Sequence, residues 1–244
     1  SSTTSSIDKE NNNLSSWNSI IKLYEIPVLY IPYLQMPLPA KKRQTGLLQP
    51  SYSKNSNFGL GIKVPYFIDV AKNKDLTITP TYYFNSEQLI VNNSWRHYTK
   101  FGAYNLNTEI SNNKIKSNFD KTVINRSKNY VRWILDGRGN FDFNKDFGAD
   151  FSIQTVADRN YLRDYHFNYL AYTASKINFD YINNRNYFGV KTIRFQELEN
   201  ASREKNSAFI LPSINSHFET KPLFFKEKLI LDSNFTTITR SEGL

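Results

Sequence analysis

Apolar and polar residues alternate with a period of two over much of the chain. In residues 75–84 one set of alternate positions is apolar: Leu76, Ile78, Pro80, Tyr82 and Phe84. Residues 58–66 and 147–155 follow the same pattern. Successive side chains of a β-strand point to opposite faces of the sheet, so this alternation predicts strands with one apolar face and one polar face.

Turn-forming residues divide the pattern into segments. Breaks rich in Asn or Gly occur at residues 55–57, 112–114, 137–140 and 183–186. After Gln44 they separate about ten or eleven candidate strands, each longer than the roughly 5–6 residues that are usual in a soluble sandwich. Helical periodicity is scarce. The chain is therefore predicted to be all-β with antiparallel strands.

The first forty residues differ from the rest. Residues 1–19 are rich in Ser and Asn, which predicts a frayed end. Residues 20–39 are apolar and interrupted by prolines, so they are expected to hold at most one strand and an extended connector. A polar step at residues 41–43 predicts a domain boundary. The expected domains are residues 1–39 and residues 40–244.

The alternation fits two architectures. A soluble sandwich or barrel buries the apolar face, whereas a transmembrane barrel turns it toward lipid and keeps a polar lumen. Mid-strand charges such as Lys63 and Asp150, and aromatic residues near strand ends, favour the membrane barrel. The discriminating residues are Phe147, Phe151 and Ile153. They should face lipid in a membrane barrel and lie in a dry core in a sandwich.

Composition narrows the function classes. The 244 residues are 39% hydrophobic, which excludes a helical membrane bundle, and 15% aromatic, which argues against disorder. With no Cys there is no disulfide and no thiol nucleophile.

The net charge of +9 suits an anionic partner, although a bias toward Lys explains it equally well. The basic residues form no compact stripe, so no nucleic-acid partner is predicted. The chain starts at Ser1 without a secretion signal, which suggests a processed or truncated chain.

Catalytic and metal motifs are nearly absent. His97, His166 and His217 are too scattered for a metal site, and no nucleotide-binding loop or Ser elbow is present. Asp158 and Asp164 are a conceivable acid pair, but residues 158–160 resemble a strand-end turn with charges facing water. Neither an enzyme nor a cofactor is predicted.

Two prolines are the most specific feature. Pro50 and Pro65 lie inside predicted strands, with the predicted turn at residues 55–57 between them. Antiparallel pairing would bring them together, and each lacks the N–H that a ladder needs. A net hydrogen bond contributes about 1 kcal/mol in water, and an unpaired group costs several in lipid. The alternative is that the prolines only bound short strands or sit at a bulge.

Several blocks resemble the outer-membrane lipopolysaccharide-assembly protein family (LptD/OstA). They lie at residues 26–37, 43–50, 64–67, 75–80, 95–98, 156–164 and 211–212. Ala157 stands where the family usually has Ser. The order and spacing of the blocks argue against coincidence. The positions matching family motifs are Pro27, Tyr30, Pro32, Tyr33, Pro37, Arg43, Gly46, Asp158, Tyr161 and Asp164.

The resemblance implies a fold and partners. Family members have a periplasmic β-jellyroll, which receives lipopolysaccharide from a periplasmic bridge protein, and an outer-membrane barrel plugged by a lipoprotein. Residues 1–39 would end the jellyroll. Residues 40–244 would form part of an antiparallel transmembrane β-barrel, with about 10–12 strands. That is fewer than half of the family's strands, so the chain is expected to be a fragment, a shortened gene or a smaller barrel.

The resemblance also implies a mechanism. In the family, lipopolysaccharide passes through the barrel lumen and leaves by a lateral gate at the first strands. Pro50 and Pro65 match the gate prolines, and Lys63 beside them is a hypothetical contact for lipopolysaccharide phosphate. The implied location is the bacterial outer membrane. The alternatives are another outer-membrane channel or a soluble β-sandwich binding module.

Overall fold

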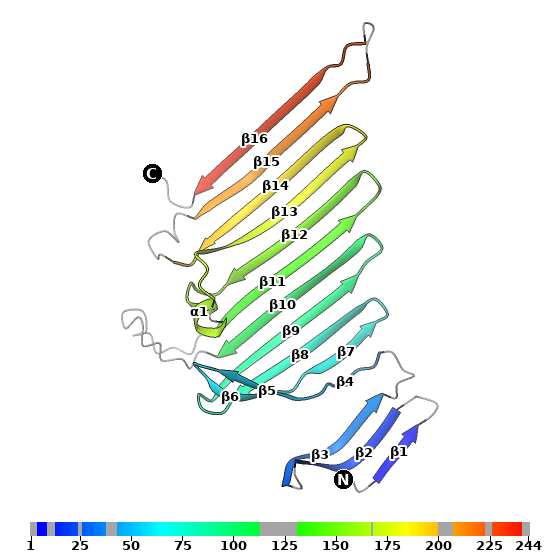
Figure 1. Cartoon of the computed structure of the whole chain (residues 1–244), viewed down its shortest axis with the longest axis vertical. Coiled ribbons are helices and arrows are strands. Elements are labelled where there is room, and N and C mark those ends of the chain that lie inside the picture. Colours follow the sequence, from blue (N-terminus) through cyan, green and yellow to red (C-terminus); the bar gives the residue numbers. More distant parts are fainter. Residues whose placement is uncertain are drawn as a thin grey trace.

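The computed structural model describes residues 4–8, 13–23, 26–37, 43–112, 131–166, 168–199, 207–222 and 226–240. These residues form a three-stranded sheet and a thirteen-stranded sheet, both antiparallel (Figure 1). The expected all-β, antiparallel fold is confirmed. No described helix is long and apolar enough to cross a membrane.

The smaller sheet contains β1 (Thr4–Asp8), β2 (Asn13–Leu23) and β3 (Ile26–Pro37) in that order. The frayed end expected for residues 1–19 is therefore wrong. The limit of one strand in residues 20–39 is also wrong, because they hold the end of β2 and all of β3. The Ser-rich segments pair as β1 and β2. The prolines of β3 are tolerated because β3 is an edge strand, where the N–H groups of one side need no partner.

The expected domain boundary and the jellyroll assignment remain predictions. Of the boundary residues 41–43, only Arg43 lies among the described residues. The smaller sheet ends at Pro37 and the larger sheet begins at Gly46.

The larger sheet begins with four short strands: β4 (Gly46–Leu47), β5 (Ser51–Asn55), β6 (Gly59–Lys63) and β7 (Tyr66–Ala71). β5 pairs with β6 and β4 pairs with β7, so the four strands form one hairpin with two interrupted sides, β4–β5 and β6–β7. We call it the first hairpin. Nine long strands follow, each paired with the next: β8 (Lys74–Tyr83), β9 (Gln88–Tyr98), β10 (Gly102–Asn112), β11 (Val131–Asp142), β12 (Phe147–Val156), β13 (Tyr172–Asn183), β14 (Asn186–Glu197), β15 (Ala208–Glu219) and β16 (Ile230–Arg240). The short helix α1 (Tyr161–His166) lies between β12 and β13.

The turn predicted at residues 137–140 is wrong, because these residues lie inside β11 and the chain turns after it. Gly137 and Gly139 make room for large neighbours. A Cβ on Gly137 would press against Leu106, and one on Gly139 would press against the ring of Phe151. These glycines therefore serve side-chain packing across the sheet.

The strand register divides the sheet into an apolar face and a polar face. Directly paired residues share a face. Phe151 is paired with Ile177 on the apolar face, and Asp136 is paired with Gln154 on the polar face. The alternation predicted for residues 75–84 and 147–155 is confirmed by β8 and β12, whereas the segment 58–66 is interrupted after Lys63.

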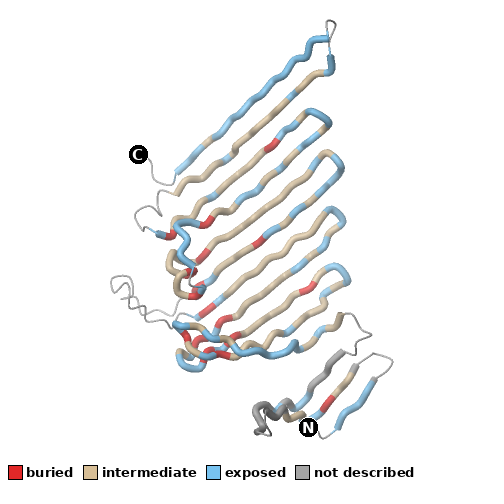
Figure 2. Tube along the Cα trace, viewed as in Figure 1, coloured by how far each residue is buried: buried red, intermediate tan, exposed pale blue. Residues whose placement is uncertain are grey.

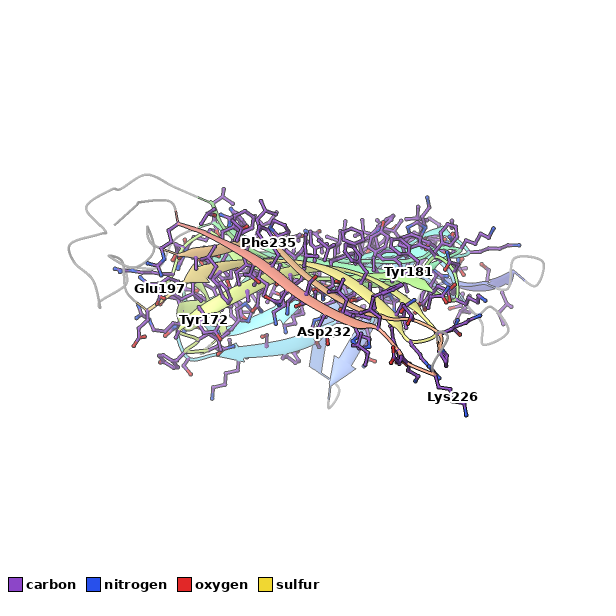
Figure 3. All side chains as sticks on the ribbon, turned by 90° about the horizontal axis from the view of Figure 1, so that it is seen from above. Tyr172, Tyr181, Glu197, Lys226, Asp232 and Phe235 are labelled. Atoms are coloured by element: carbon purple, nitrogen blue, oxygen red, sulfur yellow. The ribbon has the colours of Figure 1, made fainter. Side chains whose placement is uncertain are left out.

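Among the described residues, no second layer covers the apolar face. Figure 3 shows the sheet edge-on, with Phe235 on one side and Asp232 on the other. Phe235 is 59% exposed and Phe179 is 46% exposed. Phe147 is exposed, and Phe151 and Ile153 are not fully buried. The dry core that a soluble sandwich requires is therefore missing from the described part of the chain.

The buried hydrophobic residues gather instead at one end of the polar face. They lie where α1 and the tip of the first hairpin cover the strands (Figure 2). The cluster consists of Phe58, Tyr83, Ile90, Val156, Tyr161, Leu162, Tyr165 and Leu198.

Candidate functional site

Both sides of the first hairpin are broken at a proline. Pro50 lies between β4 and β5, and Pro65 lies between β6 and β7. The prediction that both prolines lie inside strands is wrong, because each proline lies in a break between two short strands. The predicted proximity is confirmed by the register. The β5–β6 ladder ends at the pair Ser51 and Lys63, so both prolines lie just beyond the same end of the ladder.

Two consecutive strand interfaces each lack a hydrogen bond near this break. The Leu48 N–H donates to the Pro65 carbonyl at 2.9 Å, but Pro65 has no N–H for the return bond. The Val64 N–H donates to the Pro80 carbonyl at 3.1 Å, and Pro80 likewise cannot return it. Sequence analysis missed this role of Pro80. The equal spacing of Pro50, Pro65 and Pro80 was the available signal.

The tip of the first hairpin is anchored to α1. Phe58 is only 1% exposed, and its ring lies 5.2 Å from that of Tyr83 and 5.1 Å from that of Tyr165. The Asn55 side-chain amide donates to the Tyr165 carbonyl at 3.3 Å. That of Asn57 donates to the Asp164 carbonyl at 2.7 Å. The hairpin is thus broken near its base and held at its tip.

Arg132 of β11 holds α1 on the polar face. Its Nε and Nη2 each donate to an Asp158 carboxylate oxygen at 2.7 Å, and its Nη1 donates to Asp164 Oδ2 at 3.0 Å. Such bidentate, charge-assisted bonds are stronger and more directional than neutral ones. The guanidinium carbon also lies 5.5 Å from the Tyr161 ring centroid and 5.0 Å from that of Tyr165. We call Arg132, Asp158 and Asp164 the Arg132 clasp.

The two tyrosines of α1 extend this contact. Their rings are stacked, with centroids 4.6 Å apart. The Tyr161 hydroxyl donates to Glu109 Oε1 at 2.6 Å, and Ser111 Oγ donates to the Tyr165 hydroxyl at 2.8 Å. Burial raises the pKa of both phenols, and the Glu109 carboxylate raises that of Tyr161 further. Both phenols therefore stay protonated and act as hydrogen-bonding groups.

The expectation that the charges of residues 158–160 face water is wrong for Asp158. Its carboxylate is bound by Arg132, and so is that of Asp164. Two carboxylates held by one guanidinium form a structural ion pair, which does not favour acid–base chemistry. Arg132 itself was missed because it lies 26 residues before Asp158 in sequence, and no motif links the two. Within the described residues, no His, Asp and Glu side chains group closely enough to hold a metal.

A cavity of about 400 Å³ lies on the polar face beside α1. Leu162 and His166 of α1 line one side of it. A transverse row of polar residues on β8–β12 lines the floor, each directly paired with the next: Thr77, Ser94, Asn107, Asp136 and Gln154. The neighbouring row also lines the cavity, with Thr79, Asn92, Glu109 and Ile134. Hydroxyl, amide and carboxylate groups can donate to or accept from sugar hydroxyls. The cavity chemistry therefore suits a saccharide.

Arg43 and Gly46 lie at the start of the larger sheet. Arg43 contacts Asp69 at 3.1 Å and Asp75 at 3.0 Å, and Arg96 contacts Asp75 at 2.8 Å. Arg43 Nη1 also donates to the Lys72 carbonyl at 2.8 Å. These contacts tie the chain before β4 to β7 and β8. Gly46 opens β4, opposite Phe67.

The remaining predicted site residues lie in the smaller sheet, except Lys63. Tyr30, Pro32 and Tyr33 are exposed on β3, which also contains Pro27 and Pro37. The Tyr30 hydroxyl donates to Asn18 Oδ1 at 2.6 Å, and the Tyr33 ring contacts that of Trp17. Lys63 ends β6 on the polar face, beside the proline break. The structure thus brings Asp158, Tyr161 and Asp164 together at α1, whereas the motif residues of β3 lie in the smaller sheet.

Comparisons with known proteins show which sequences this chain resembles. The family model described as LPS transport system D matches residues 130–244, which include the Arg132 clasp. The LPS-assembly protein LptD of Idiomarina loihiensis is 31% identical over 62% of this chain. That of Shewanella frigidimarina is 26% identical over 93% of it. Both comparisons support the resemblance of this chain to the LptD family. The chain covers 18% and 28% of these two relatives, respectively.

The resemblance to the LptD family rests on the family model and on the curated relatives. The recognition made from the motif blocks is confirmed. The match to Shewanella frigidimarina extends well beyond the region of the family model, because it covers 93% of the chain. The similarity therefore includes the first hairpin as well as α1.

Proposed function

We propose that this chain takes part in lipopolysaccharide transport and assembly at the outer leaflet of the bacterial outer membrane. The observation that carries the proposal is the sheet itself. One face is apolar and uncovered, while the opposite face is polar and contains a cavity of saccharide chemistry. A membrane barrel with a polar lumen accounts for both faces. The curated relatives are named LPS-assembly proteins, which supplies the substrate class.

The long strands suit a transmembrane span. β8–β16 each contain 10–12 residues, close to the roughly 9–11 that a tilted strand needs to cross a membrane. Aromatic rings cluster near the β9–β10 and β11–β12 turns: Phe101, Tyr104, Phe141, Phe143 and Phe147. Aromatic girdles of this kind mark the membrane–water interface of barrels.

The polar face is proposed to line the lumen through which the sugars of the glycolipid pass. The lipoprotein that plugs the barrel would occupy the same lumen. Residues 1–39 are proposed to end the periplasmic jellyroll, which receives lipopolysaccharide from the bridge protein. No catalytic step is proposed, because Arg132 binds the carboxylates of both Asp158 and Asp164.

The first hairpin is proposed to be the lateral gate. Pro50 and Pro65 interrupt its strands, and Pro80 removes a further ladder bond at the same place. We call the weakly paired strand contacts at these three prolines the seam. Weak pairing lets the strands separate at the seam, while the anchored tip at Phe58 keeps the hairpin attached. Lys63 lies on the polar face beside this seam and is proposed to contact lipopolysaccharide phosphate during exit.

The gate is tested by restoring the missing donors. Pro50→Ala, Pro65→Ala and Pro80→Ala would each add a backbone N–H at the seam. In the protein as the cell makes it, the triple variant is expected to strengthen the seam and lower surface lipopolysaccharide at unchanged protein level. Gln49→Ala is the matched control, because it alters the same break without adding a donor. Undiminished export in the triple variant would reduce the prolines to simple strand ends.

A further inference from the structure

A second feature of the polar face lies one row beyond the cavity. Residues on successive strands β8–β13 are directly paired in this row: Asp75, Arg96, Asn105, Arg138, Ser152 and Lys176. Three of the six are cations, on alternate strands. Arg96 has its own carboxylate, because Asp75 lies 2.8 Å from its Nε.

Arg138 and Lys176 have no acidic partner within 4.0 Å among the residues that the structure describes. Both are exposed. They flank Ser152 and are therefore about 10 Å apart, two strand spacings, at the backbone. Two like charges on one row repel each other, so an anion between them would be favourable.

The nearest carboxylates on this face are already engaged. Asp136, two residues from Arg138, accepts from the Gln154 side-chain amide at 3.4 Å. Asp150, two residues from Ser152, accepts from Asn178 Nδ2 at 2.8 Å. Each carboxylate is thus paired with a neutral amide, which leaves the two cations and the Ser152 hydroxyl as the groups available to a ligand.

We propose that Arg138 and Lys176, on either side of Ser152, bind a phosphate group of the transported glycolipid. Guanidinium, ammonium and hydroxyl groups are the donors that phosphate oxygens accept from. The site adjoins the cavity, since Asp136 and Gln154 line the cavity floor and lie two residues from Arg138 and Ser152. A sugar in the cavity would therefore place its phosphate on this pair. The inference rests on the proposed transport function.

The test measures binding to the detergent-solubilised protein as the cell makes it. The probes are fluorescent lipopolysaccharide with phosphorylated core sugars, the same material after dephosphorylation, and phosphatidylglycerol as competitor. Arg138→Gln and Lys176→Gln are each expected to weaken binding of the phosphorylated probe about tenfold, the loss of one charge-assisted bond, and to leave the dephosphorylated probe unchanged. Arg138→Lys keeps the charge and should retain most of the affinity. Lys145→Gln, in the turn after β11, should bind like the native protein.

Each other outcome overturns the assignment. Equal loss for both probes would mean that the two cations act on something other than phosphate. Competition by phosphatidylglycerol as strong as by the phosphorylated probe would identify a phospholipid headgroup site instead. If the native protein binds lipopolysaccharide and the Gln variants bind it equally well, the phosphate site alone is wrong. If the native protein binds neither form, the proposed function fails with it.

Discussion

Replacing Arg132 by Met should release α1 from the polar face. The change removes the three bonds of the Arg132 clasp, leaves Asp158 without a counter-charge and leaves Asp164 with only Arg163, whose Nε lies 3.7 Å from Asp164 Oδ1. Removing one partner of a buried ion pair costs about 3–5 kcal/mol. The Asp158 and Asp164 side chains are 26% and 14% exposed, so water recovers part of this loss. We therefore expect about 3 kcal/mol, which is roughly a hundredfold in the opening equilibrium.

Hydrogen exchange of the α1 amides measures this opening. The Asp164 N–H, which donates to the Asn160 carbonyl at 2.9 Å, should exchange roughly a hundredfold faster in Arg132→Met. Arg138→Met is the control, because Arg138 lies on the same face of β11 without an ion pair. Adding Asp158→Asn and Asp164→Asn to Arg132→Met removes the unpaired charges and should recover part of the protection.

The same experiment can refute the reasoning. Unchanged exchange of the α1 amides in Arg132→Met, with the sheet still folded, would mean that aromatic packing alone holds α1. Equal acceleration in Arg138→Met would mean that the effect is not specific to the clasp.

Two other perturbations test the neighbouring features. Phe58→Ala should free the tip of the first hairpin, because deleting a buried Phe costs about 3–5 kcal/mol. Trypsin should then cut the chain after Lys54. Phe84→Ala, at an exposed position, should not cause this cleavage. Single cysteines at Phe151 and Ser152, in a chain with no Cys, should react with lipid-soluble and water-soluble maleimides respectively. A cysteine at 151 that is closed to both reagents, in a protein soluble without detergent, would exclude the membrane barrel.

Sequence periodicity determined the all-β class and the two faces of the long strands. β8 and β12 follow the alternation closely, because their apolar side chains share one uncovered face and need no special packing. The periodicity failed where packing mattered more than pattern. Gly137 and Gly139 were mistaken for a turn, since their purpose depends on Leu106 and Phe151 from neighbouring strands.

The prolines were recognised from the sequence, but their geometry was not. Spacing alone indicated that Pro50 and Pro65 would meet. Only the hydrogen bonds revealed that the strands stop there and that Pro80 removes another donor. Which carbonyl lacks its partner depends on register, and a difference of one residue in register changes that answer.

The sequence by itself determined the all-β class, the alternating faces of strands such as β8 and β12, the absence of an N–H at each proline and the motif blocks that resemble the LptD family. These are local properties, set by residue type and spacing along the chain. Only the tertiary structure joined Arg132 to Asp158 and Asp164, anchored Phe58 on α1, and aligned Arg138 with Lys176. Those contacts connect distant segments or separate strands, and their partners follow from strand order and register, which no spacing in the chain specifies.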